Sequence, residues 1–413
     1  MPWIGVALAL AFGAWLRLAF PLDIEWKADE AWSFAHAQAM VAGGAWPPLG
    51  MPTSIATPNP GLSAWVFGAL TWLSGAKTPP DLARAVALCN IAALAALVAF
   101  AVVCVDRARR EPWLWAAALV AVNPLAMIFE RKIWPPSVLP LPAAALLWAW
   151  WNRRLWPLAL LWGALGALIG QIEESAWFFA LAIAAWTWVR DRAAFPWAPW
   201  LAGSMLGALP ALPWALDTLH SGVTPLHALR LPIMAFYLRW LTQPFGFGLD
   251  YSLGHSFGAF LAWPMVGGQA TWLMAAAHAL LAAIFAWLLL LALRRLARNR
   301  PPAGDVLLGV SPETTLLAAA LWGYGLSLSL ITVFGPDSHR HYLIVVAPLM
   351  GLCLAMTMLW AAPSVRQARL LLAALCLCQA ALSAGALTYI DHKGVVDATF
   401  GRFGVTWEAQ TSG

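Results

Sequence analysis

The stretch Asp23-Ile24-Glu25-Trp26-Lys27-Ala28-Asp29-Glu30-Ala31-Trp32 directly follows the first long apolar run of the chain, which ends near Pro21. It carries four carboxylates in a protein of 413 residues, of which only 10% are charged. Ionisable side chains at membrane level are expensive to bury and are therefore functional candidates by default. The stretch predicts a functional site just outside the first membrane span.

The composition is that of a protein embedded in a membrane. Hydrophobic residues make up 62% of the chain and the mean hydropathy is +0.72, whereas soluble domains are about half apolar and about one quarter charged. We therefore expect an all-α polytopic membrane protein, organised as a single domain over residues 1–413. The net charge of +5 comes with arginines scattered over short loops. Because no soluble basic face is formed, nucleic-acid binding is not expected.

The apolar runs define candidate spans, and the arginine clusters between them define sidedness. A spanning helix needs about 20 residues, and short cytoplasmic loops carry an excess of arginine and lysine. The runs are 3–20, 61–76, 83–105, 112–129, 135–151, 155–170, 175–189, 198–216, 271–293, 314–334, 342–361 and 369–389. The clusters are Arg107/Arg109/Arg110, Arg153/Arg154, Arg190/Arg192, Arg294/Arg295/Arg298/Arg300 and Arg366/Arg369. After the first cluster, two apolar runs separate each cluster from the next. Spans that begin and end on the same side of the membrane must come in such pairs.

The region before Arg107 breaks this pairing, because three runs precede the cluster. The run 61–76 is short, starts after Pro60 and ends at Ser74-Gly75, so we predict an interfacial helix on the outer side. This gives about eleven spans, with the N-terminus inside and the C-terminus outside; a short true span with an odd topology is the alternative. Residues 29–42 are predicted to form an amphipathic helix in the first outer loop.

With this topology, unusual polar residues gather on the outer side. The candidates are Asp29 and Glu30 in the first loop, Glu130, Arg131 and Lys132 in the second, Glu173 and Glu174 in the third, and His339, Arg340, His341 and Tyr342 in the loop that also holds Asp337. The large loop 217–270 adds Asp217, His220, His227, Arg230, Tyr237, Arg239, Asp250, Tyr251 and His255. Acids and cations on one face are suited to hold an anionic group and to move a proton.

Each part of this set also has an ordinary structural explanation. Arg131 and Lys132 are suited to snorkel toward lipid headgroups, and Glu173-Glu174 to form a solvated turn. The segment His339-Arg340-His341 is equally consistent with a polar turn, and Asp29-Glu30 with the charged start of a helix. The agreement of all of them on one side favours a common site.

The order of these features resembles that of the GT-C glycosyltransferases, in particular the protein O-mannosyltransferases and the bacterial lipid A aminoarabinose transferases. The shared features are a first span, an acidic pair at the start of the first outer loop, and an interfacial helix after a proline-containing turn. The matching residues are Arg17, Asp29-Glu30-Ala31-Trp32, Pro58-Asn59-Pro60-Gly61-Leu62, Asn123-Pro124, and Arg340-His341-Tyr342 before Pro348. The resemblance covers most of the length through topology, and short motifs carry it.

The resemblance implies a polyprenyl-phosphate-linked sugar as donor, presented on the outer leaflet of a bacterial inner membrane, and an active site facing the periplasm. Asp29 would match the acidic residue proposed as general base, with Glu30 beside it, and Asp23 and Glu25 are then expected to be surface charges. Arg131, Lys132 and Arg340 would lie near the donor phosphate. The other residues expected to contact substrate are Glu130, Glu173, Glu174, His339, His341, Tyr342 and Asn59.

Two positions depart from the family pattern. The turn before the interfacial helix has Asn59 where the aminoarabinose transferases have lysine. The segment Trp134-Pro135-Pro136-Ser137 lacks the second aspartate that many relatives carry after the third span, for which Glu130 or the pair Glu173-Glu174 could substitute. The metal requirement is therefore open; if a divalent cation binds, the acidic pair Asp29-Glu30 is its expected ligand.

The expected reaction is glycosyl transfer with inversion. A base removes the proton from an acceptor hydroxyl of a lipid, a glycan or a protein, while the sugar leaves its lipid phosphate. Because phosphate is already a good leaving group, cations that hold it suffice and no strong acid is required. The helix 61–76 and the loop 217–270 are expected to line a groove for the polyprenyl chain.

Two other function classes fit a membrane protein of this kind. A transporter or flippase of a lipid-linked substrate is the main alternative, although midplane charges and repeated halves would then be expected. An acyltransferase or O-antigen-ligase type of enzyme is the other alternative. An acyltransferase would need a histidine buried in a span, for which His278 is the candidate. The transferase interpretation rests partly on fold analogy, which is associative evidence.

Overall fold

The computed structural model describes residues 2–52, 58–191, 197–221, 233–299, 302–334, 339–396 and 403–412. In the first part the elements are α1 (Pro2–Leu18), α2 (Ala28–Val41), β1 (Leu49–Pro52), β2 (Pro58–Pro60), α3 (Leu62–Ser74), α4 (Pro79–Val103), α5 (Arg110–Val122), α6 (Pro124–Phe129), η1 (Pro135–Val138), α7 (Pro140–Trp151), α8 (Trp156–Ile172), α9 (Ser175–Asp191), α10 (Trp197–Ala208), η3 (Leu209–Ala211) and α11 (Leu212–Ser221). The label η marks short 3-10 or π-helical segments.

The second part is also helical, with four short strands near the loops and the tail. Its elements are α12 (Ile233–Thr242), η4 (Gln243–Phe245), α13 (Leu249–Leu253), η5 (Gly254–Ser256), α14 (Phe257–Leu261), β3 (Met265–Val266), β4 (Gln269–Ala270), α15 (Leu273–Arg298), α16 (Ala303–Leu308), α17 (Pro312–Ala318), η6 (Ala319–Tyr324), α18 (Gly325–Phe334), η7 (Arg340–Val346), α19 (Ala347–Ala361), α20 (Val365–Lys393), β5 (Val395–Val396), β6 (Gly404–Val405) and α21 (Trp407–Thr411). The strands form three two-stranded antiparallel pairs, β1 with β2, β3 with β4 and β5 with β6.

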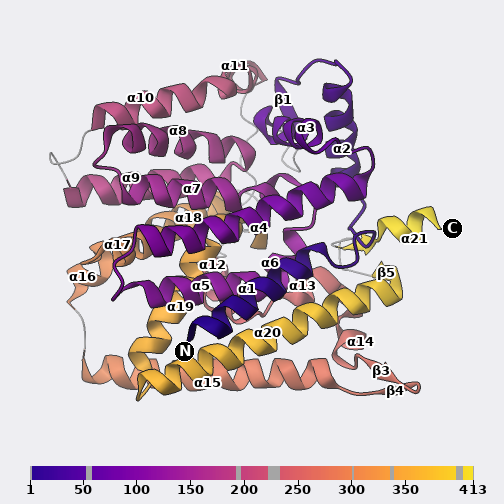
Figure 1. The fold of residues 1–413 in the computed structure, drawn as a ribbon. Helices are drawn as coiled ribbons and strands as arrows, with labels where there is room; N and C mark the ends of the chain where they lie inside the picture. The colour runs from indigo at the N-terminus through magenta and orange to yellow at the C-terminus, as the bar shows by residue number, and fades with distance from the viewer. Residues whose placement is uncertain are drawn as a thin grey trace.

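The elements of the predicted outer loops lie together at one end of the helix bundle. Figure 1 shows α2, α3 and β1 of the first loop, β3 and β4 of the large loop, and β5 and α21 of the tail on the right of the view. The start of α1 lies toward the opposite end. The grouping of loops inferred from the arginine clusters is therefore found in the fold, while the membrane side that this end faces stays a prediction.

Four helical segments of the described chain are long and apolar enough to cross a membrane. They are α4, α15, the continuous segment Arg340–Ala361 formed by η7 and α19, and α20. The bundle also exposes large apolar side chains such as Trp72 and Leu377, both 71% exposed, as expected of a surface that faces lipid. The chain is a multi-pass membrane protein, and the total of about eleven spans remains a prediction.

The first loop contains the helices that the sequence predicted. Helix α2 begins at Ala28 and ends at Val41, close to the predicted 29–42. Helix α3 has 13 residues, which at about 1.5 Å per residue is roughly 20 Å, shorter than a hydrocarbon core of about 30 Å. It packs on α2 and leads directly into α4 at the same end of the bundle, so its position agrees with an interfacial helix.

Helix α5 forms the centre of the bundle. Every residue from Trp113 to Val122 is buried, as expected of a helix that is apolar on all sides. Helix α1 crosses it closely because Gly13 has no side chain; a Cβ there would collide with the backbone of Ala121. This close crossing brings the end of α1, including Arg17, against the end of α5.

A break after α5 directs the chain into the charged turn. Asn123 has an extended backbone, and its Oδ1 accepts hydrogen bonds from the amides of Leu125 and Ala126, both 3.1 Å long. Pro124 occupies the first position of α6, where a missing N–H is harmless. The short helix α6 then ends at Phe129, so the next three residues, Glu130 to Lys132, lie in a turn rather than along one helix face.

Candidate functional site

The three consecutive charged residues after α6 contact three different partners. Glu130 accepts a hydrogen bond of 2.6 Å from Nε of Arg17. Arg131 donates to backbone carbonyls at the end of α1, with 2.8 Å to Leu16 and 2.7 Å to Phe20. Lys132 is directed to the carboxylates of the first loop. The structure therefore brings Lys132 into the acidic cluster, while Glu130 and Arg131 fasten α6 to α1.

Lys132 lies between two buried carboxylates. Its Nζ is 2.9 Å from Oε2 of Glu25 and 3.4 Å from Oε1 of Glu30. Lys27 also forms an ion pair with Glu25. Glu25 is 2% exposed and Glu30 is 0% exposed, so these charges depend on their partners rather than on water.

The electrostatics of this cluster favour a permanent cation at Lys132. Burial alone would lower the pKa of its ammonium, but the Glu25 and Glu30 carboxylates outweigh burial and raise that pKa. Burial raises the pKa of Glu25 to about 7, although Lys132 acts against the rise. An anion entering the cluster would thus meet a lysine that stays protonated throughout the physiological range.

The acidic pair at the start of α2 is divided between the interior and the surface. Asp29 is exposed and Glu30 is fully buried, because adjacent helical residues point about 100° apart. The interpretation of Asp23 and Glu25 as surface charges is wrong, since they are 4% and 2% exposed. Lys132 already neutralises Glu30, so the pair does not present two uncompensated carboxylates to a metal ion.

An aromatic contact connects the lysine to the segment that begins at Arg340. The ammonium of Lys132 lies 4.5 Å from the ring centroid of Trp134, and the ring of His341 packs edge-on against the same tryptophan at 4.6 Å. His341 stacks on His339 with a centroid distance of 5.2 Å. The second outer turn and η7 therefore form one wall of the site.

Arg340 offers a second cation from this segment. Its guanidinium is 5.7 Å from the ring of Tyr251 and 3.7 Å from a carboxylate oxygen of Asp250, both on α13. Within the described part of the chain, its Nη1 atom is buried without a hydrogen-bond partner. The Tyr251 hydroxyl is also close enough to interact with Lys132, so Tyr251 lies near both cations.

The predicted third turn joins the site through tyrosines. Helix α8 ends at Ile172, and Glu173 and Glu174 connect it to α9. Both carboxyls interact with the Tyr342 hydroxyl, and the Tyr324 hydroxyl donates a 2.6 Å hydrogen bond to the Tyr342 carbonyl.

These two acids are held partly protonated near neutral pH. Burial raises the pKa of Glu173 to about 8, with the Glu174 charge adding to the rise. Burial also raises the pKa of Glu174 to about 7. A carboxyl that keeps its proton can donate a hydrogen bond to a neutral polar substrate.

The remaining candidates lie apart from this cluster or beyond the described residues. Asn59 donates a 3.1 Å hydrogen bond to the Met51 carbonyl, which holds the β1–β2 hairpin together. His278 bonds the Met274 carbonyl of its own helix at 2.8 Å and packs against Phe257. His227, Arg230 and Asp337 lie outside the residues that the structure describes.

Sequence reasoning named Glu25 and Tyr251 among the outer polar residues but gave neither of them a role in the site. A signal for Tyr251 existed: the chain has only five tyrosines beside 28 tryptophans. Three of the five, Tyr251, Tyr324 and Tyr342, interact with the charged residues of this region. Glu25 could be found only from the contact between the first and second loops, which neither segment reveals alone.

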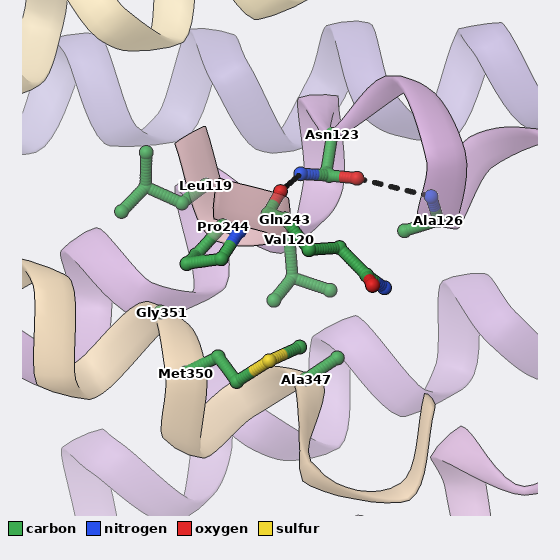
Figure 2. Close-up of a pocket in the computed structure, with 9 residues that line it drawn as sticks. All are labelled: Leu119, Val120, Asn123, Ala126, Gln243, Pro244, Ala347, Met350 and Gly351. Atoms are coloured by element: carbon green, nitrogen blue, oxygen red, sulfur yellow. Dashed lines mark hydrogen bonds between the residues drawn. The ribbon is translucent and has the colours of Figure 1, made fainter. Parts of the chain in front are cut away.

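A cavity at the break between α5 and α6 is separate from the charged cluster. Figure 2 shows it lined by Leu119, Val120, Asn123, Ala126, Gln243, Pro244, Ala347, Met350 and Gly351. Asn123 closes one side by donating a 2.8 Å hydrogen bond to the Gln243 carbonyl. None of the predicted site residues lines this cavity, and its polar groups serve the helix break.

A larger, apolar pocket lies between α12, α15 and α19. Its walls include Trp240, Phe245, Phe285, Leu289 and Met350. The lining is almost wholly hydrocarbon and aromatic, which is the chemistry that a lipid tail or a neighbouring apolar chain fills.

Comparisons with known proteins extend the resemblance seen in the sequence. No family model and no curated protein matches the chain. Among solved structures, the lipid A aminoarabinose transferase ArnT from Cupriavidus metallidurans, bound to undecaprenyl phosphate, aligns with a TM-score of 0.51 at 13% identity, covering 94% of this chain and 76% of that one. The apo oligosaccharyltransferase of Archaeoglobus fulgidus aligns with a TM-score of 0.48 at 12% identity, covering 94% of this chain and 56% of that one. The expected architecture is confirmed at the level of the fold: this multi-pass membrane chain has the fold of the GT-C glycosyltransferases.

Proposed function

We propose that this protein is a membrane glycosyltransferase that moves a sugar from a polyprenyl-phosphate carrier to an acceptor hydroxyl. The observation that carries the proposal is the pair of cations, Lys132 and Arg340, beside Tyr251 and next to the acidic start of α2. The fold supports it, because the structural neighbour ArnT was solved with undecaprenyl phosphate bound. The lipid tail would occupy apolar surface such as the pocket between α12, α15 and α19.

The donor phosphate is assigned to the two cations. Lys132 stays protonated because Glu25 and Glu30 hold it, and Arg340 has a buried Nη1 atom to which no described residue offers a hydrogen bond. A guanidinium and an ammonium placed together can hold the growing negative charge of a phosphate leaving group. Arg131, with its donors on the α1 carbonyls, would support this arrangement by fixing the turn.

Asp29 is assigned as the general base. Its carboxylate is exposed, so an acceptor can reach it, whereas Glu30 is engaged with Lys132. Asp29 takes the hydroxyl proton, the acceptor oxygen bonds to the anomeric carbon, and the bond from that carbon to the phosphate oxygen breaks. Polyprenyl phosphate leaves with the electron pair, and attack from the opposite face inverts the anomeric centre.

Glu173 and Glu174 are assigned to the sugar. With pKa values of about 8 and 7, they carry protons for part of the time at neutral pH. Protonated carboxyls donate hydrogen bonds to sugar oxygens without bringing a second full negative charge beside the phosphate. Tyr342, which interacts with both, would hold them in place.

The Asp29→Asn variant tests the base. A deletion strain complemented with wild type should recover a sugar-modified lipid, glycan or protein that the strain complemented with Asp29→Asn lacks. Loss of a general base typically lowers the rate about 10²–10⁴-fold. Mass spectrometry of lipid and glycan extracts, with membrane levels of each variant measured in parallel, is the readout.

A matched control is Asp106→Asn, which removes another exposed aspartate away from the site. It should behave as wild type. Full modification by Asp29→Asn at equal membrane levels would reject the assignment of the base, and an unchanged extract in the deletion strain would reject the transferase itself.

The outward orientation of this end is tested by cysteine labelling. Ser74, the last residue of α3, is exposed, whereas Thr71 is only 2% exposed and would shield a thiol. In a background without the native cysteines, Ser74→Cys should react with an impermeant reagent from outside. Asn299→Cys, after the end of α15, should react only after the membrane is opened; the reverse pattern would overturn the predicted topology.

A further inference from the structure

The C-terminal tail returns to the acidic stretch that follows α1. After the β5–β6 pair, Thr406 forms an antiparallel bridge with Glu25. The Trp407 amide donates a 3.0 Å hydrogen bond to the Ile24 carbonyl, and the Trp26 amide donates a 3.3 Å bond to Val405. The tail therefore adds a short strand beside residues 22–26.

Three carboxylates from separate parts of the chain meet where this strand joins the loop. Asp23 comes from the loop, Asp391 from the last turns of α20, and Glu408 from the first turn of α21. One carboxylate oxygen from each lies within 4.8 Å of the other two. Convergence of residues 23, 391 and 408 requires both the fold of the bundle and the return of the tail.

The most buried of the three has an oxygen without a donor. Asp23 is 4% exposed, and its Oδ2 atom has no hydrogen-bond partner among the described residues. Asp391 and Glu408 are exposed, so the cluster opens to water on that side. A buried carboxylate oxygen without a donor, in a side chain that meets two more carboxylates, points to a cation that balances their charge.

The described residues hold this cluster without a direct ion pair. No ion pair within the described ranges involves Asp23, Asp391 or Glu408. Arg131 lies close enough to interact with Asp23, but its guanidinium donates to the backbone carbonyls of α1. Burial raises the pKa of Asp23 to about 7, and the Asp391 and Glu408 carboxyls add to the rise.

We propose that Asp23, Asp391 and Glu408 bind one divalent, oxygen-preferring cation of the Ca²⁺ class, which fastens the C-terminal tail to the loop before α2. Carboxylate-only ligands suit hard cations rather than zinc or copper. Ligands from three separate segments, with two of them open to water, suit the adaptable coordination of Ca²⁺ better than the strict octahedron of Mg²⁺. The site is distinct from the Asp29-Glu30 pair, which the sequence offered as the ligands if a divalent cation binds.

The test uses the full chain in lipid nanodiscs, stripped with EDTA and titrated with Ca²⁺ alone. Isothermal titration calorimetry should find one site in wild type, and saturating Ca²⁺ should raise the apparent Tm by about 2 °C or more. The Glu408→Gln variant, which changes an exposed side chain at nearly constant shape, should lose both effects. Asp305→Asn, an exposed acid on α16, should keep both.

Hydrogen exchange locates the ion. Ca²⁺ should slow exchange of the Trp407 and Glu408 amides, which donate to carbonyls of the loop at Ile24 and Leu22. Absence of binding to wild type, or binding that survives Glu408→Gln or leaves the tail amides unprotected, would overturn the proposal. A rise in Tm on going from pH 8 to pH 6 that Asp23→Asn reduces, without any response of wild type to Ca²⁺, would show that the cluster shares a proton instead. None of these readouts depends on glycosyl transfer.

Discussion

Two acidic clusters lie within a few residues of each other on the loop after α1, and they differ in where their positive charge comes from. Glu25 and Glu30 hold Lys132 of the second loop. Asp23 meets Asp391 and Glu408, and none of the ion pairs among the described residues involves it. A buried carboxylate must be neutralised by a proton, a cation or hydrogen bonds. In the first cluster, the Lys132 side chain of the protein balances the carboxylates, whereas in the second the negative charge has to be balanced by an ion or a proton from solution.

The largest expected effect comes from removing the cation of the first cluster. Lys132→Met leaves Glu30 without its ion-pair partner and Glu25 with only Lys27. Removing one partner of a buried ion pair typically destabilises by about 3–5 kcal/mol. We expect a large fall in apparent Tm in nanodiscs, together with loss of transfer.

A second variant separates charge from packing at this position. Because Glu25 and Glu30 carry the unbalanced charge, the triple variant Lys132→Met, Glu25→Gln and Glu30→Gln should recover part of the lost Tm, although not the activity. An unchanged Tm in Lys132→Met would contradict the proposed difference between the two clusters, since it would mean that the first cluster does not depend on its lysine.

The next effect is a dependence of stability on pH. The pKa values of Glu25, Glu174 and Glu173 are raised to about 7, 7 and 8, so the folded chain holds protons that the unfolded chain releases at lower pH. Their contribution to stability is complete below the ordinary glutamate pKa and is lost as pH rises through 7 to 8. The apparent Tm should therefore be higher at pH 6 than at pH 9.

Glu173→Gln should flatten this profile, because a neutral amide takes the place of the acid with the highest pKa of the three. Exposed Asp106→Asn is the control and should leave the profile unchanged. A wild-type Tm that rises from pH 6 to pH 9 would contradict the raised pKa values.

The comparison also shows what the sequence could and could not predict. Gly43-Gly44 and the acids at 29–30 define α2 within one residue at each end, because such end signals are local. The gathering of polar loops at one end followed from the arginine pattern. The partners of residues 130–132 did not follow from the sequence. These three adjacent side chains reach different partners because of the break at Asn123-Pro124 and because of contacts far along the chain.

The two acids that the sequence reasoning set aside illustrate the same limit. Asp23 and Glu25 look like ordinary loop charges, since nothing nearby in the sequence covers them. They are buried because the tail returns as a strand beside residues 22–26 and because Lys132 approaches from the second loop. Long-range contacts of this kind leave no periodic signal in the sequence. The Asp29 assignment, by contrast, rests on a local motif and awaits its test.

The smallest expected effect is the difference in Tm between Asp23→Asn and Glu25→Gln. It is also the most direct test of the contrast between the two acidic clusters. In EDTA, Asp23→Asn removes one of three repelling carboxylates and provides an amide that can donate to Asp391 or Glu408, so its Tm should equal or slightly exceed that of wild type. In Ca²⁺, wild type should gain stability and Asp23→Asn should not, which reverses the order. Glu25→Gln should lie below wild type in both conditions, because it weakens a pair that the protein completes by itself. If Asp23→Asn instead lowers Tm equally with and without Ca²⁺, both clusters are balanced from within the chain, and the difference between them is one of packing rather than of charge.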